Sequence, residues 1–159
     1  MNSSSRLPAG PEPAMPIVKK SALVPYSAAE MFDLVADVEK YPEFLPWCGR
    51  TDVQERSEQG MVATIRIAYR GLSQSFTTQN QHERPHRIEL RLRDGPFSRL
   101  HGEWTFSELK DDACRIDLTL DYQIRGGLAA RLLGPVFGQI AQTLVSAFVS
   151  RAEDLAARP

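Results

Sequence analysis

The sequence GLAARLLGPVFGQIAQTLVSAFVSRAEDLA, residues 127–156, predicts one long α-helix with a broad apolar stripe. Its apolar side chains recur every three or four residues, which places them on one side of a helix. That side holds Leu133, Phe137, Ile140, Ala141, Leu144, Val145, Phe148, Ala152 and Leu155. No residue on this stripe can carry a proton, a metal ion or a covalent intermediate. Laid across a curved sheet, such a helix either completes a solid core or covers an apolar cavity.

The region before this helix, from about residue 51 to residue 125, has a period of two. Apolar and polar residues alternate there, which is typical of antiparallel strands with one buried and one solvent-exposed face. The alternation is regular in 61–69, 88–93, 100–107 and 114–124, and turn-forming residues lie between these segments. We therefore expect about six strands in this region.

The chain before residue 51 predicts one strand and two helices. Residues 17–24 form an apolar-rich strand that ends at Pro25. Ser27 and Glu30 have the spacing of a capping box, in which each side chain accepts a hydrogen bond from the other residue's backbone N–H. A shorter helix follows at 38–41, and Pro42 and Pro46 prevent a long regular helix after it. The complete order predicts an α+β fold, in which a bent antiparallel sheet of about seven strands wraps around the C-terminal helix.

Length and charge limit the functions that this chain can have. Its 159 residues suffice for one domain, expected at 16–157, after a Pro- and Ser-rich extension at 1–15 that is expected to be disordered. The net charge of −1 gives no general attraction to DNA or to anionic lipid. No apolar run reaches the roughly 18 residues of a membrane span. We expect a cytoplasmic protein with buried, reduced thiols at Cys48 and Cys114.

Five short segments resemble one protein family. They are LVPYS at 23–27, YPEFLP at 41–46, DGPF at 94–97, GEWTF at 102–106 and DACRI at 112–116. In these segments the chain closely resembles the ribosome-association toxin family RatA, which is similar to the mitochondrial coenzyme Q-binding START-domain proteins. Both groups belong to the polyketide cyclase and lipid-transfer superfamily. The resemblance implies a single START-like domain with the helix-grip fold and an apolar tunnel between the long helix and the sheet.

The same resemblance implies two functions of different classes. The first is non-enzymatic binding or transport of ubiquinone or a related prenyl lipid for respiration, with no cofactor required besides that ligand. The second is a toxin of a toxin–antitoxin pair, which binds the large ribosomal subunit and blocks its joining to the small subunit. We expect the lipid-binding function and keep the ribosomal function as the alternative.

A ligand cavity would be lined by the inward residues of the strands and of the long helix. Gln74 and Thr78 share a face of one strand with Phe76, and these polar groups are expected to hydrogen-bond the carbonyls of a quinone, with Tyr69 or Tyr122 nearby. A strand end that reaches solvent would give the same pattern, and a solid core would also explain the apolar residues. The expected lining is Ile65, Ile67, Tyr69, Gln74, Phe76, Leu90, Leu92, Trp104, Phe106, Leu118, Leu120, Tyr122, Phe137, Ile140, Leu144 and Phe148.

The segment 41–47 is the expected mouth of this cavity. Its aromatic and apolar residues would touch a membrane surface, giving peripheral contact with the inner membrane face. A hydrophobic plug packed on the sheet edge would have the same composition. These mouth residues are Tyr41, Phe44, Leu45 and Trp47. Nearby in the fold, Gly134–Pro135 predicts that the main helix starts at Pro135, after a turn that can open.

Catalytic and metal-ion functions find little support in the sequence. No nucleophile lies beside an obvious base, and no metal-binding motif occurs, so we expect neither catalytic residues nor metal ligands. The three histidines, His82, His86 and His101, fall at strand ends or at polar positions of strands and are expected on the surface. Some relatives in the superfamily are cyclases or hydrolases, which leaves an enzyme as a minor alternative.

Binding to the ribosome requires a surface for RNA or for a ribosomal protein. The outward positions of the strands hold several cations, but acidic residues are interspersed, so cross-strand ion pairs explain most of them. No aromatic residues interleave with the arginines as a platform for single-stranded RNA requires. These cations, which permit a ribosomal contact without predicting one, are Lys19, Arg66, Arg70, Arg91, Arg93, Arg115 and Arg125.

Overall fold

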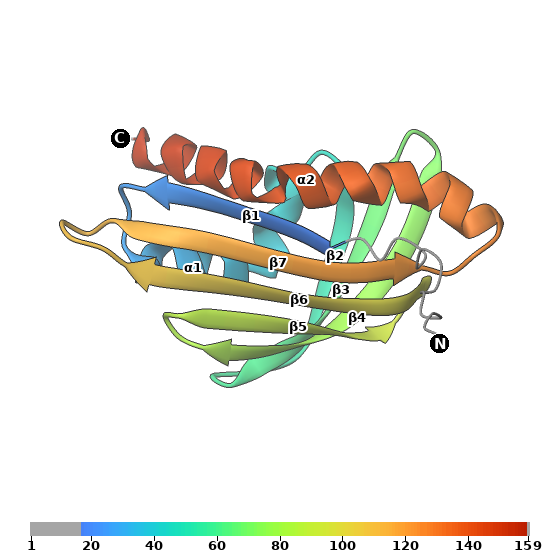
Figure 1. The fold of residues 1–159 in the computed structure, drawn as a ribbon, viewed down its shortest axis with the longest axis horizontal. Coiled ribbons are helices and arrows are strands. Elements are labelled where there is room, and N and C mark those ends of the chain that lie inside the picture. Colours follow the sequence, from blue (N-terminus) through green and yellow to red (C-terminus); the bar gives the residue numbers. More distant parts are fainter. Residues whose placement is uncertain (1–16, 159) are drawn as a thin grey trace, which may run out of the picture.

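In the computed structural model, which describes residues 17–158, seven antiparallel strands form one sheet that curves beneath a long helix (Figure 1). The order across the sheet is β1-β7-β6-β5-β4-β3-β2. The strands are β1 (Ile17–Val24), β2 (Cys48–Ser57), β3 (Gly60–Tyr69), β4 (Leu72–Glu83), β5 (Arg87–Asp94), β6 (Phe97–Glu108) and β7 (Cys114–Ile124). The helices are α1 (Ala28–Ala36), the 3-10 helix η2 (Val38–Glu43) and α2 (Leu128–Ala156). The predicted α+β, helix-grip architecture is confirmed. The predicted extension at 1–15 lies outside the described residues.

The capping box at the start of α1 forms as the sequence predicts. The Ser27 hydroxyl accepts a hydrogen bond from the Glu30 N–H at 3.1 Å, and the Glu30 carboxylate accepts one from the Ser27 N–H at 2.9 Å. The helix ends at Asp37, and Pro42 lies inside the short 3-10 helix that follows. Because of these breaks, the chain turns between α1 and β2 and brings residues 41–47 beside α2.

The sheet follows the sequence order, because each strand from β2 to β7 pairs with the next along the chain. β1 pairs with β7, so the first and last strands of the chain lie side by side. The β3–β4 turn is made by Arg70 and Gly71, whose φ angles of 51° and 85° are both positive. Glycine adopts this left-handed conformation readily, which favours a tight hairpin at that point.

The helix α2 is continuous and begins at Leu128, with Pro135 in its interior. The prediction that it starts at Pro135 is therefore wrong. Leu133 is fully buried, and this contact holds the turns before Pro135 against the core. Residues 130–156 are long and apolar enough to cross a membrane by length and composition alone. In this fold, however, their apolar stripe packs against the concave face of the sheet.

Two clusters of buried apolar side chains fill the space between α2 and the sheet. The first includes Phe32, Trp104 and Phe148 and reaches from α1 to the C-terminal half of α2. The second includes Phe97 and Phe137, whose ring centroids are 4.9 Å apart. Residues of both clusters line one shared cavity, so the helix both completes a core and covers a cavity.

Candidate ligand-binding cavity

The cavity lies between α2 and the concave face of the sheet and has a volume of about 80 Å³. Its wall is almost entirely apolar, and no Asp, Glu, Lys or Arg side chain of the described residues lines it. Most of the residues that the sequence predicts for a cavity do line this one. They are Ile65, Phe76, Leu90, Trp104, Leu120, Phe137, Ile140, Leu144 and Phe148.

Other predicted lining residues pack inside the two clusters instead of facing the cavity. The Tyr122 ring lies 4.7 Å from the Phe137 ring, and the Phe106 ring stacks parallel to Trp104 at 6.2 Å. Their inward orientation was predicted correctly, but neighbouring side chains fill the space in front of them. The residues corrected in this way are Ile67, Leu92, Phe106, Leu118 and Tyr122.

Tyr69 and Gln74 do not approach the cavity either. Tyr69 is 38% exposed at the end of β3, where it borders an outer groove between Trp47 and α2. Gln74 lies opposite Ile67, close to the β3–β4 turn. The prediction that Tyr69 and Gln74 line the cavity is therefore wrong, because both residues lie towards the hairpin turn, past the end of the cavity.

Three polar side chains at alternate positions of β4 do line the cavity. Thr78 and Asn80 are buried, and the Thr78 hydroxyl donates a hydrogen bond to the Asn80 side-chain oxygen at 2.6 Å. His82 is half-buried, with its ring edge-on to Phe32 at 5.5 Å between centroids. The His82 Nε2 is buried without a hydrogen-bond partner among residues 17–158. A buried polar atom left unpaired costs about 1–3 kcal/mol, which a hydrogen bond from a ligand would offset.

The expectation that His82 lies on the surface is thus wrong. The alternation that places Phe76 and Thr78 on the inward face of β4 continues to Asn80 and His82, so the parity of this strand identifies His82 as inward. Sequence reasoning also missed the part of the wall that α1 and η2 supply. Its residues are Val35, Ala36 and Val38, which follow directly from the apolar face of α1.

The environment of His82 predicts a pH dependence of stability. Burial, followed by repulsion from Arg56, lowers the pKa of His82 below its ordinary value of 6.5. As the pH falls below about 6.5, His82 therefore binds a proton in the unfolded chain but stays neutral in the folded protein. This difference lowers the free energy of unfolding on acidification. We expect the melting temperature to fall between about pH 7 and pH 5 less steeply in His82→Phe than in the wild type. The exposed His86→Gln variant should keep the wild-type slope, and equal slopes in all three proteins would contradict this assignment.

The predicted mouth, residues 41–47, forms part of the cavity wall. Tyr41 and Trp47 line the cavity. Leu45 is only 1% exposed, and Phe44 packs edge-on against Phe148 with 5.3 Å between ring centroids. Phe44 and Leu45 therefore contribute to packing beside α2, as the alternative of a hydrophobic plug describes.

Arg151 of α2 also contacts the segment 41–47. Its guanidinium pairs with the Glu43 carboxylate at 2.7 Å and lies 4.9 Å from the centre of the Phe44 ring. Arg151 is itself buried, and the ion pair lowers the pKa of Glu43. These contacts join η2 to the C-terminal half of α2 beside the cavity.

Burial favours the neutral forms of the thiols and of a phenol near the cavity. Cys48 and Cys114 are free and buried, as predicted, and burial raises the pKa of each thiol to about 11. Burial likewise raises the pKa of Tyr41. Within residues 17–158, no group of three His, Cys, Asp or Glu side chains could hold a metal ion. The cavity wall offers apolar contact and a few hydrogen bonds.

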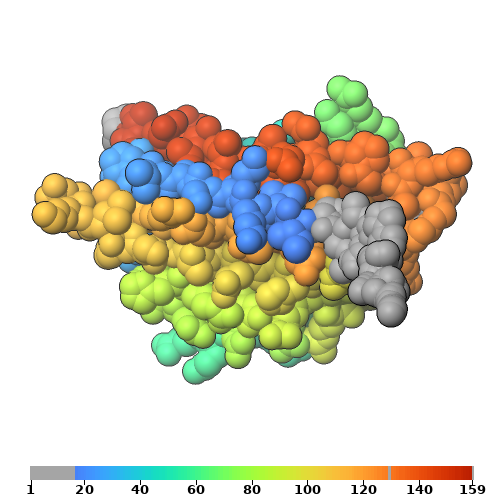
Figure 2. All heavy atoms as spheres, viewed as in Figure 1, coloured from blue at the N-terminus to red at the C-terminus, as the bar shows by residue number. Residues whose placement is uncertain are grey.

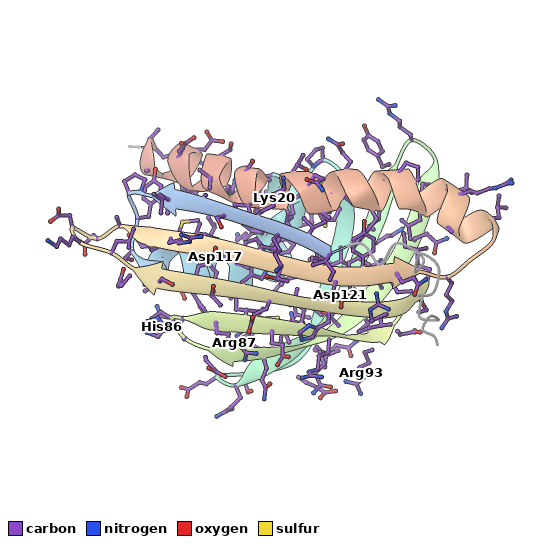
Figure 3. The ribbon with its side chains drawn as sticks, viewed as in Figure 1. Lys20, His86, Arg87, Arg93, Asp117 and Asp121 are labelled. Carbon is purple, nitrogen blue, oxygen red and sulfur yellow. The ribbon has the colours of Figure 1, made fainter. Side chains whose placement is uncertain are left out.

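The outer face of β5, β6 and β7 carries alternating charges that pair with one another. Figure 3 labels Arg87, Arg93, Asp117 and Asp121 among them. The Arg99 guanidinium, for example, lies 3.0 Å from the Asp121 carboxylate. The predicted cations that pair with carboxylates are Arg91, Arg93 and Arg115, with Glu89, Glu55 and Asp117 as their partners. Ion pairing therefore accounts for these three cations, although two of the pairs lie within one strand and not across strands as predicted.

Known proteins resemble this chain over most of its length. Residues 24–149 match the family described as polyketide cyclase/dehydrase and lipid transport. The chain is 48% identical to the ribosome association toxin RatA of Pseudomonas aeruginosa, over 87% of this chain and 96% of the relative. It is 29% identical to the mitochondrial coenzyme Q-binding protein of Drosophila melanogaster, over 82% of this chain and 55% of the relative.

A solved structure shares the fold. The Zhui aromatase/cyclase from Streptomyces sp. R1128 superposes with a TM-score of 0.75, covering 88% of this chain and 94% of the other. The two sequences are 20% identical, so this likeness concerns the architecture and not the chemistry.

Proposed function

We propose that this chain binds the large ribosomal subunit and hinders its joining to the small subunit. The chain belongs to the polyketide cyclase/dehydrase and lipid transport family, and within this family it is 48% identical to a protein named for ribosome association. The observation that carries this proposal is the 48% identity over 96% of the length of such a relative. The relative named for coenzyme Q binding is 29% identical. We therefore favour ribosome binding, the alternative function in the sequence analysis, over lipid binding.

Co-sedimentation tests this proposal with purified components. The protein is mixed with isolated large or small ribosomal subunits and centrifuged through a sucrose cushion. We expect it to pellet in stoichiometric amounts with the large subunits and to stay in the supernatant with the small ones. Protein that remains in the supernatant with both subunits would contradict the proposal.

A second function is favoured by a specific observation, the apolar cavity with its three polar residues. We propose that the cavity binds a neutral, apolar ligand with one or two oxygen atoms, such as ubiquinone or another prenyl lipid, and performs no chemistry on it. The absence of charged lining residues within 17–158 disfavours carboxylate or phosphate groups. Asn80 and His82 supply hydrogen-bonding groups at the β4 side. Collecting such an insoluble ligand would require peripheral contact with a membrane.

The free energy of such binding would come mainly from the apolar tail of the ligand. Burying about 100 Å² of apolar ligand surface contributes roughly 2.5 kcal/mol, whereas a neutral hydrogen bond adds only about 1 kcal/mol. The cavity of about 80 Å³ is smaller than the roughly 150 Å³ apolar cavity that admits benzene. A prenyl chain therefore enters only if lining side chains move.

A substitution that fills the cavity distinguishes an effect on ligand binding from an effect on folding. Ala63 is buried and lines the cavity, so Ala63→Leu places additional carbon atoms in the empty space. We expect this variant to lose uptake of a short-tailed ubiquinone, measured by tryptophan fluorescence quenching, with a melting temperature at or near that of the wild type. Gln142→Leu adds similar apolar bulk on the exposed side of α2 and should bind normally. Unchanged ubiquinone affinity in Ala63→Leu would exclude this cavity as the site.

A further inference from the structure

Three arginines on the β2–β4 side of the sheet differ from the paired arginines of β5–β7. Arg50, Arg66 and Arg70 are exposed, and none forms an ion pair with a carboxylate of the described residues. We call these three residues the arginine face. The sequence from residue 60 to residue 82 contains no Asp or Glu, so β3 and most of β4 supply no counter-charge. Asp52 and Asp94 occupy neighbouring outward positions without pairing to the arginine face.

Two of these arginines are placed directly against each other. Arg50 and Arg66 are register partners on β2 and β3. Like charges at directly opposite positions of a sheet repel and destabilise it. Arg66 is held by a neutral contact, because its Nε donates a hydrogen bond to the Ser73 hydroxyl at 2.8 Å. A pair of cations that forms no ion pair with a carboxylate of residues 17–158 is typical of a surface whose counter-charge is supplied by a partner.

The surroundings of the arginine face fit a phosphate backbone. The outward residues of β4 are Ser73, Ser75, Thr77 and Gln79, and short hydroxyl and amide side chains are common phosphate contacts in nucleic-acid complexes. The β3–β4 hairpin projects beyond α2 at the upper edge of the molecule (Figure 2, green). At its tip the Arg70 guanidinium lies 5.1 Å from the centre of the exposed Tyr69 ring. Tyr69 itself borders the groove beside α2, so this contact places the Arg70 guanidinium at the tip of the hairpin.

We propose that the arginine face, together with the outward hydroxyls of β4, binds the sugar–phosphate backbone of RNA. This inference rests on the proposed ribosomal function and deepens it, since it names the chemistry that the chain recognises and the strands that do so. The cavity lies on the opposite, concave face of the sheet, so RNA contact leaves it unobstructed.

Fluorescence anisotropy with a labelled RNA stem-loop tests the proposal. Removing one phosphate-contacting arginine lowers the salt dependence of binding by about one unit of slope in log K against log salt. We expect Arg50→Gln/Arg66→Gln to lose about two units of slope and to bind at least about tenfold more weakly near 100 mM salt. Arg91→Gln/Arg115→Gln is the matched control, because it removes the same charge from paired positions and should bind within about twofold of the wild type. An equal loss in both double variants, or no loss in the first, would overturn the proposal.

Two companion measurements separate this inference from the function on which it rests. If the wild type and Arg50→Gln/Arg66→Gln pellet equally with large subunits, the arginine face is not the contact, although the ribosomal function stands. If neither pellets but the RNA slopes behave as expected, the face binds RNA and the ribosomal function fails. If the wild type binds phosphatidylglycerol vesicles but not the stem-loop, the proposal is overturned and the arginine face binds a membrane instead. The double variant should melt at or above the wild type, because a repulsive pair is removed.

Discussion

Replacing Phe148 by alanine is expected to destabilise the protein by about 3–5 kcal/mol, the range for deleting a fully buried phenylalanine side chain. Phe148 is 1% exposed and lies where α2, η2 and β6 meet. Its ring makes edge contacts with Tyr41, Phe44 and Trp104, at centroid distances between 5.3 and 5.4 Å. Because it also lines the cavity, the space left by the deletion adds to an existing void that the surrounding side chains cannot close.

Thermal unfolding measures this effect. A loss of this size lowers the melting temperature of a chain of this length by roughly 10 °C. Gln142→Ala on the exposed side of the same helix is the control and should change stability by less than about 0.5 kcal/mol. If Phe148→Ala melts within a few degrees of the wild type, the packing between α2 and the segment 41–47 is not what holds the helix on the sheet.

Gly60→Ala is the second substitution with a large expected effect. Gly60 follows the β2–β3 turn with φ 153°, and a Cβ atom there would lie 1.9 Å from the backbone oxygen of Asn80. Real side chains do not tolerate such an approach, and the obstacle is backbone, so β3 and β4 must separate. We expect a loss of about 3 kcal/mol or more, seen in chemical unfolding as a lower denaturation midpoint.

Gly71→Ala provides the comparison for that variant. Gly71 also has a positive φ angle, 85°, but a Cβ atom there would meet nothing within 4 Å. Its replacement costs only the unfavourable backbone conformation, about 1 kcal/mol. Equal destabilisation by the two substitutions would show that conformation, and not the contact between Gly60 and the Asn80 backbone, determines the effect.

The fold could be predicted from the sequence because its determinants are local. Ser27 and Glu30 are three residues apart and cap each other, and the alternation around Leu118 and Leu120 specifies which face of β7 is buried. Pro135 misled the prediction of the helix start, since its effect depends on tertiary packing. The buried Leu133 holds the preceding turns in place, and that contact involves residues far away in the sequence.

The cavity could be predicted only in part, for a related reason. Alternation shows which face a side chain occupies but not how far along the strand the open space extends. Gln74 and His82 share the inward parity of β4, yet His82 lines the cavity and Gln74 lies beyond its end. The arginine face could not be predicted from the sequence for a similar reason. Only the register reveals that Arg50 lies opposite Arg66. Among residues 17–158 neither forms an ion pair with a carboxylate, whereas Arg91 and Arg115 do.

The proposed action on ribosomal subunits is tested most directly by a sucrose-gradient profile of subunit joining. Isolated large and small subunits are combined under conditions that favour joining, with increasing amounts of the protein. We expect the joined-ribosome peak to decrease and the separate subunit peaks to increase as protein is added, and the protein to migrate with the large subunit. An unchanged joined-ribosome peak at a molar excess of protein, with the protein remaining at the top of the gradient, would contradict the proposal.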